Sequence, residues 1–164
     1  MSARLWALDV QYLQTSVVTA AVGFDAWTDA VPLREFTVRS SEPPADYTPG
    51  KFYQRELPYL LRVLAGVAAE AVIIDGNVWL TDHAPGLGAR LHDAIGVPVV
   101  GVAKNPFRGA PAIAVVRGHS AKPLHVTAVG IAAELAADHV RAMHGEFRIP
   151  TLLKRADSLA RGTL

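Results

Sequence analysis

The sequence predicts an α/β fold in which a mixed β-sheet is flanked by helices. Over the first forty residues, three strand-like segments follow one another with short turns between them, as expected for an antiparallel meander. After residue 50, segments with helical spacing alternate with short apolar strands, which is typical of parallel strands that are covered on both faces. We expect residues 1–164 to form one domain.

The first three strands are predicted from runs of β-type residues. Residues 4–10 hold four apolar residues ahead of Asp9, residues 16–24 form a nearly continuous Val/Ala run, and residues 32–39 alternate apolar and polar side chains. The next segment, SSEPPADYTPG (residues 40–50), is expected to be a loop because it carries three prolines and a glycine.

The second half begins with a helix, because Leu57, Leu60, Leu61 and Leu64 recur at spacings of three and four. Pro58 is expected in its first turn, where proline is tolerated. The later elements are expected in this order: strand 71–74, a Gly-rich loop 77–88, helix 89–94, strand 98–102, strands 112–116 and 124–129, helix 131–144, and helix 150–160.

The composition excludes several classes of protein. A hydrophobic content of 51% with 19% charged residues excludes a disordered chain, and the absence of cysteine excludes a disulfide scaffold or a cysteine nucleophile. The N-terminal segment lacks the pattern of a signal peptide, and no apolar run reaches the roughly 18 residues of a membrane span, so we expect a cytoplasmic protein with no membrane partner. The net charge of +1 decides neither for nor against a nucleic-acid partner.

Two apolar strands each deliver an aspartate to their carboxyl end, Asp9 in the first and Asp75 in the fourth. If the two strands are neighbours, the carboxylates lie a few ångströms apart and repel each other by roughly 4 kcal/mol at an effective dielectric constant near 20. A divalent cation with oxygen ligands would offset that repulsion. The alternative is that each aspartate merely begins a turn.

Other candidates also have plain structural interpretations when they are considered singly. Glu56, at the expected start of a helix, could serve the helix dipole, and His83 could be an ordinary surface residue. Lys104 ends a Val-rich strand and could bind phosphate or nothing at all. Tyr47 lies between prolines, where most tyrosines simply pack.

The order of the motifs is more specific than any one of them. LDVQY, DYTPG, FYQRE, VIIDG, HAPGLG, VPVVGVAK and RIPTLLKRAD follow one another between about residue 5 and residue 160. In this order they resemble the endonuclease V family. The resemblance implies an RNase H-like fold and a metal-dependent endonuclease of the DNA-repair type, which hydrolyses phosphodiester bonds near deaminated adenine (deoxyinosine or inosine). It implies nucleic acid, DNA or RNA, as the partner, and we expect a monomer.

The resemblance also implies roles for individual residues. Asp9, Glu56 and Asp75 match the three acidic ligands of a Mg²⁺ ion, for which Mn²⁺ could substitute. His83 matches a histidine near the attacking water or the scissile phosphate, and Lys104 a lysine that contacts that phosphate. The place of a further ligand in the last helix is occupied by Asp157.

Substrate binding is expected to involve two loops. Tyr47 belongs to the segment that matches the family's wedge, which enters the duplex where the base is turned out, and Pro49 and Gly50 complete that segment. The other loop contributes three glycines that permit close backbone approach to a nucleotide: Gly76, Gly86 and Gly88.

The chain departs from the family pattern mainly in the loop after Asp75. The segment between Asp75 and His83 is two residues longer than usual, and Val78 stands in place of a glycine. Pro85 and Ile131 replace an expected arginine and histidine. Two alternatives therefore stay open: a non-catalytic nucleic-acid or nucleotide-binding module on the same fold, or an RNase H-like nuclease of other specificity.

Overall fold

The computed structural model describes residues 2–41 and 52–163, and its first three strands form the predicted antiparallel meander. β1 (Leu5–Tyr12) pairs with β2 (Val17–Phe24), and β2 pairs with β3 (Arg34–Ser40). The expectation that β1 ends at Asp9 is wrong, because β2 pairs with β1 as far as Tyr12. Asp9 therefore lies inside a strand that continues beyond its parallel neighbour.

The remaining strands extend the same sheet, in the order β3-β2-β1-β4-β5-β7-β6. β4 (Ala71–Asp75) pairs in parallel with β1 and with β5 (Val99–Ala103). β7 (Leu124–Val129) and β6 (Ile113–Val115) then return to antiparallel pairing. The sheet is mixed as predicted, but its parallel part consists of β1, β4 and β5 alone among the described strands.

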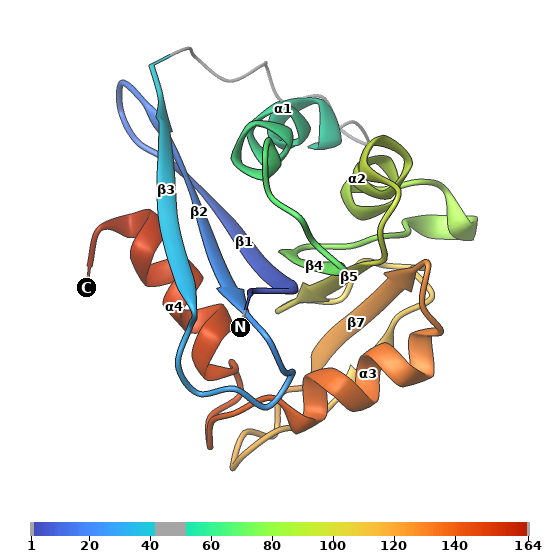
Figure 1. Cartoon of the computed structure of the whole chain (residues 1–164). Coiled ribbons are helices and arrows are strands. Elements are labelled where there is room, and N and C mark those ends of the chain that lie inside the picture. The colour runs from blue at the N-terminus through green and yellow to red at the C-terminus, as the bar shows by residue number, and fades with distance from the viewer. Residues whose placement is uncertain (1, 42–51, 164) are drawn as a thin grey trace.

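Helices cover both faces of this sheet, which gives three layers (Figure 1). One side carries α1 (Phe52–Leu64) and α2 (Leu87–Ile95), and the other carries α3 (Ala133–Ala142) and α4 (Thr151–Arg161). In the described part of the chain, no helix is long and apolar enough to cross a membrane.

β2, β4 and β5 are apolar along nearly their whole length because both of their faces are buried, whereas β3 alternates polar and apolar residues. On β1, Leu5 and Ala7 pack with the residues of α3 and α4, while Trp6 and Leu8 pack with those of α1 and α2. This alternation assigns odd-numbered residues of β1 to the α4 side of the sheet and even-numbered residues to the α1 side.

Two local features differ from the prediction. α1 begins at Phe52, so Glu56 lies in its second turn and Pro58 lies inside the helix. A proline there removes one helical hydrogen bond, but buried contacts of Leu60 and Val63 with the sheet stabilise the helix nevertheless. The predicted Gly-rich loop contains a single 3₁₀ turn, η1 (Thr81–His83).

Candidate active site

Asp9 and Asp75 lie next to each other on the α4 side of the sheet. The parallel pairing of β1 with β4 ends at Leu8 and Ile74, so the two aspartates are one step beyond the last pair. Neighbouring strands are about 5 Å apart, and both side chains point to the same face. The prediction that adjacent strands bring these carboxylates together is confirmed by this register.

Glu56 approaches the same strand ends from the opposite layer, because it belongs to α1. Its neighbour Arg55 lies over the Tyr12 ring, 4.3 Å from the ring centroid. The Tyr12 hydroxyl is close enough to lower the pKa of Glu56, although burial and the two aspartates outweigh this effect. Asp9 and Asp75 thus come from one face of the sheet and Glu56 from the other.

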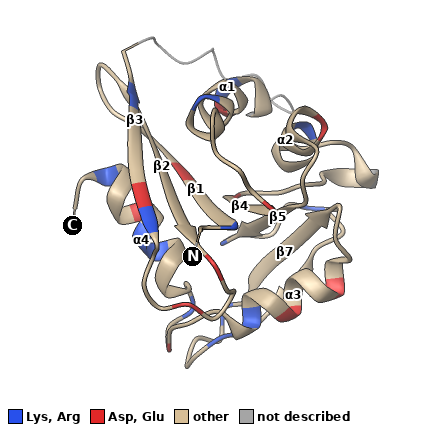
Figure 2. Cartoon of the chain, in the orientation of Figure 1, with Lys and Arg blue, Asp and Glu red and all other residues tan. Residues whose placement is uncertain are grey.

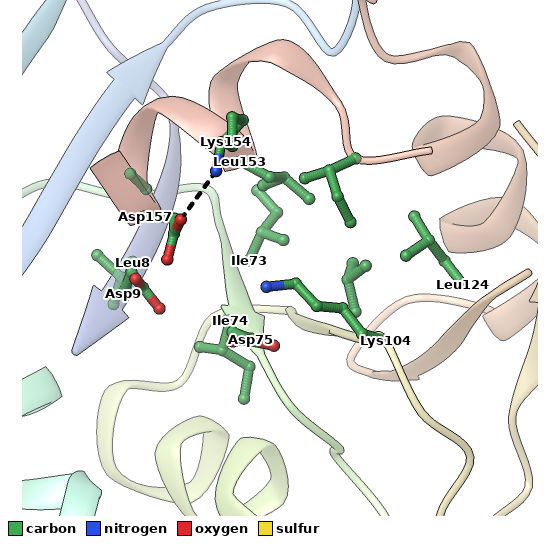
Figure 3. Close-up of a pocket in the computed structure, with 13 residues that line it drawn as sticks. Leu8, Asp9, Ile73, Ile74, Asp75, Lys104, Leu124, Leu153, Lys154 and Asp157 are labelled. Carbon is green, nitrogen blue, oxygen red and sulfur yellow. Dashed lines mark hydrogen bonds and ion pairs between the residues drawn. The ribbon is translucent and has the colours of Figure 1, made fainter. Parts of the chain in front are cut away.

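Two pockets meet at the aspartates. The α1 pocket is lined by Leu8, Asp9, Val10, Glu56, Leu60, Ile74 and Asp75. The α4 pocket is lined by five polar residues, Asp9, Asp75, Lys104, Lys154 and Asp157, which are labelled in Figure 3. Its apolar lining consists of Leu8, Ile73, Ile74, Val102, Leu124, Ile149, Leu153 and Ala156. Because Asp9 and Asp75 line both pockets, they are accessible from either side of the strand ends.

Burial and mutual repulsion disfavour the charged forms of these acids. The pKa of Asp9 is raised to about 7, chiefly by burial and then by the charges of Asp75 and Asp157. The pKa of Glu56 is raised to about 8, by burial and by both aspartates. Burial also raises the pKa of Asp75, although this side chain reaches solvent and Lys104 opposes the shift. A cation bound here would relieve this accumulation of negative charge.

Asp157 joins the cluster from α4, but two cations already hold it. Lys154 donates to one carboxylate oxygen over 3.3 Å and Arg161 to the other over 2.8 Å. These contacts lower the pKa of Asp157, although burial alone would raise it. In Figure 3 the Lys104 ammonium extends into the α4 pocket between Asp75 and the side chains of α4.

The donor set suits a hard divalent cation, since carboxylate oxygens are the preferred ligands of such ions. In the described residues, however, no three Asp, Glu or His side chains stand close enough together to hold one ion as they are placed. Glu56 is kept apart from the two aspartates because it comes from α1 on one face of the sheet, whereas Asp9 and Asp75 point to the other face. The chemistry of the acids therefore fits a metal, and their side chains would have to move together to ligate it.

The predicted loop residues have mixed outcomes. His83 is exposed, has a φ of 60°, and is not among the residues that line either pocket. The backbone of Gly76 has a φ of 136°, which favours glycine. Tyr47, Pro49 and Gly50 lie outside the described residues.

Gly86 and Gly88 are required by contacts within the protein. A Cβ on Gly88 would lie 2.6 Å from Val78 Cγ2, and one on Gly86 would lie 2.9 Å from the Asn77 carbonyl oxygen. Val78 is fully buried, so the residue that replaces a family glycine fills space that Gly88 leaves open. A contact of these glycines with a nucleotide stays a prediction.

Sequence reasoning missed three basic residues of the site. Lys154 and Arg161 hold Asp157, and the Arg148 guanidinium donates to the backbone carbonyl of Lys104. Lys154, Asp157 and Arg161 lie three and four residues apart, and this helical spacing was a usable signal. Nothing in the sequence pointed to Arg148, because its partners are backbone groups distant along the chain.

The sequence matches known proteins over almost its whole length. A family model described as Endonuclease V matches residues 2–126. The endonuclease V of Streptomyces avermitilis is 34% identical over 98% of this chain and 80% of its own length, and that of Streptomyces coelicolor is 32% identical over 98% and 79%. The chain belongs to the endonuclease V family. It is therefore a member of a family of metal-dependent nucleases that hydrolyse phosphodiester bonds.

Solved structures of endonuclease V share the fold. The catalytic domain of human endonuclease V has a TM-score of 0.82 at 21% identity, covering 98% of this chain and 82% of that one. Endonuclease V of Ciona intestinalis, in complex with a 24mer DNA containing an inosine followed by a ribo-adenosine, has a TM-score of 0.83 at 18% identity, with 98% and 85% covered. The seven-stranded mixed sheet with its flanking helices is an RNase H-like α/β fold, as predicted.

Proposed function

We propose that this endonuclease V cuts nucleic acid near deaminated adenine, deoxyinosine in DNA or inosine in RNA, with Mg²⁺ as its metal and Mn²⁺ as a substitute. The observation that carries this proposal is that Asp9, Glu56 and Asp75 line one pocket, the α1 pocket, beside the end of β4 in a member of this family. The Ciona intestinalis relative with inosine-containing DNA supports the choice of substrate.

In this proposal Asp9, Glu56 and Asp75 would hold the metal. The chemistry that a bound metal would supply there is activation of a water and stabilisation of the charge on the leaving oxygen. Lys104 places its ammonium beside the same carboxylates, where it would contact the scissile phosphate. Asp157 would contribute a further ligand only when Lys154 or Arg161 releases it.

The proposal also assigns roles to the two loops and to His83. Tyr47, with Pro49 and Gly50, would act as the wedge that turns the base out, and Gly76, Gly86 and Gly88 would form the loop facing it. His83 would act near the water or phosphate only if its exposed 3₁₀ turn is brought toward the cleft by substrate. We propose that the active form is a monomer.

The proposal is tested with oligonucleotides that carry inosine or adenine at one position, as DNA and as RNA, in Mg²⁺, Mn²⁺ or EDTA. Metal-dependent cutting near inosine alone supports it. If both substrates are cut alike, the protein is an RNase H-like nuclease of other specificity. If neither is cut although binding persists, it is a non-catalytic binding module.

Asp75→Asn is expected to lower the cleavage rate at least about a hundredfold, because it removes a charged oxygen that the metal and the reaction require. Circular dichroism and melting temperature should stay close to those of the wild type, since the side chain reaches solvent. The matched control is Asp138→Asn on α3, whose carboxylate pairs with Arg141 at the surface and should not affect the rate. Full activity of Asp75→Asn in Mg²⁺ would overturn the proposed roles.

A further inference from the structure

The loop that leaves Asp75 is fastened to β7 by two hydrogen bonds. The Val78 amide donates to the Thr127 hydroxyl over 2.8 Å, and the Trp79 indole N–H donates to the Ala128 carbonyl over 2.9 Å. Thr127 is fully buried, and its hydroxyl reaches the Val78 amide beside Gly101, the β5 residue with which Thr127 pairs. Both bonds join residues that are 49 positions apart in the sequence.

The same loop is closed on itself. The Gly86 amide donates to the Val78 carbonyl over 2.9 Å, and the Leu80 amide donates to the Ala84 carbonyl over 2.7 Å. At its far end the Thr81 hydroxyl donates to the Arg108 carbonyl over 2.7 Å. A segment with this many internal bonds cannot shift one residue without moving its neighbours.

The chain between Asp75 and the two fastening bonds is very short. Gly76 donates its amide to the Val102 carbonyl, and its own carbonyl lies so close to Gly101 that a Cβ there would be 2.5 Å away. Gly76 and Asn77 alone separate Asp75 from the anchored residue Val78. The backbone of Asp75 is itself held by pairing with Val102 of β5, so the bonds at Val78 and Trp79 can act on the orientation of its side chain only through the turn of Gly76 and Asn77.

We propose that Thr127 and Trp79 are positioning residues for Asp75: by fixing residues 76–80 on β7, they hold this carboxylate in the orientation that cleavage requires. The inference rests on the proposed function of the cleft. Trp79 supplies its bond to β7 from within the loop between Asp75 and His83. The indole is partly buried beside the α1-side core rather than free at the surface.

The decisive variants are Thr127→Val, which keeps the size of the side chain, and Thr127→Ser, which keeps the hydroxyl. We expect Thr127→Val to lower kcat about tenfold with KM changed less than about twofold, because a displacement of an ångström or less at a reacting group has costs of this order. Thr127→Ser should recover most of the rate. Trp79→Phe keeps a ring but loses the indole N–H, and should lower kcat about three- to fivefold.

The control is Trp27→Phe. Trp27 stacks on His139 of α3 with 4.7 Å between ring centroids, so its replacement perturbs an aromatic contact outside the loop. An equal loss of kcat in Trp27→Phe, or in Thr127→Ser, would show a general loss of stability and overturn the inference. If Thr127→Val does not fold, Trp79→Phe and its control decide the question.

Hydrogen exchange at the Val78 amide tests the anchoring separately from activity. We expect protection of about a hundredfold or more in the wild type and its loss in Thr127→Val. An unprotected Val78 amide in the wild type overturns the inference. A wild type that cuts no inosine substrate overturns the proposed function instead, and the exchange result then decides the anchoring alone. Wild-type kcat in both Thr127→Val and Trp79→Phe leaves the proposed function standing and removes the inference.

Discussion

Gly101 of β5 has no side chain, and this allows the turn at Gly76 and the Thr127 side chain of β7 to lie close to it. A Cβ at this position would lie 2.5 Å from the Gly76 carbonyl oxygen and 2.8 Å from the Thr127 hydroxyl. Neither neighbour can move freely, since one belongs to the turn after Asp75 and the other holds the Val78 amide. The requirement for glycine here comes from close approach and not from backbone conformation.

Gly101→Ala is therefore expected to destabilise the protein by about 1–3 kcal/mol, as overpacking does, and to lower kcat roughly tenfold. Urea unfolding and single-turnover cleavage measure the two effects. Gly96→Ala is the matched control, because Gly96 ends α2 with a φ of 75° and has open space around it. That change should cost about 1 kcal/mol of stability through backbone strain and leave kcat unaltered. Equal kcat losses in the two variants would contradict this interpretation.

Individual site residues were predictable where one strand or one motif carried the information. Asp9 and Asp75 follow apolar runs whose strands pair, so their proximity could be predicted without a structure. Thr127 and Gly101 gave no such signal, because each matters only through a residue of the loop after β4. Contacts between distant segments depend on tertiary packing, which local patterns do not encode.

At the scale of elements, β3 and α4 are joined by a bidentate ion pair. Arg155 donates from Nε and Nη2 to the two oxygens of Glu35, over 2.8 Å and 2.5 Å. This hydrogen-bonded contact lowers the pKa of Glu35 below its usual value of 4.5. A carboxyl with a lowered pKa in the folded protein stabilises the fold at pH values above 4.5, and this contribution disappears as the pH falls through the lowered pKa.

Glu35→Gln is accordingly expected to lower the melting temperature at pH 7 by only about 2 °C, since both side chains are partly exposed to solvent, and by less as the pH falls below 4.5. Thermal melts of both proteins at pH 7, 5 and 3 give the comparison. Glu70→Gln serves as the control, because its pair with Arg4 is longer, at 3.2 Å, and more exposed. A difference in melting temperature of the same size at pH 3 would refute an electrostatic origin.

Element type followed from periodicity more reliably than element boundaries did. Apolar runs predicted the strands that are covered on both faces, and alternation of apolar and polar residues predicted β3, which is partly exposed. The start of α1 was placed too late because Pro58 suggested a first turn, whereas packing on the sheet maintains the helix around it. Tertiary contacts can override a local signal in this way.

At the scale of the whole molecule, the balance of charge determines how strongly the protein attracts the phosphates of a nucleic acid. Its 16 basic and 15 acidic residues leave a net charge of +1. In Figure 2 acidic and basic residues are interspersed along the helices and strands. Of the described residues that line the α1 and α4 pockets, two are basic, Lys104 and Lys154, and Lys154 is paired with Asp157. Attraction of phosphate must then be local, from a few side chains and a bound cation.

This distribution predicts a weak dependence of binding on salt. Neutralising about two to four phosphates gives a Kd that rises about 10- to 100-fold between 50 and 200 mM KCl, whereas a strongly basic protein with about eight contacts would lose far more. Fluorescence anisotropy of a labelled inosine oligonucleotide in EDTA, where no cleavage is expected and no divalent cation is bound, measures the part of this salt dependence that comes from side chains. Lys104→Gln should reduce the slope of log Kd against log salt concentration by about one, which corresponds to one phosphate contact. Arg141→Gln should not change this slope, because Arg141 lies on α3 and lines neither pocket. A thousandfold loss of affinity over this range would mean that an extended basic surface outside the cleft binds the nucleic acid.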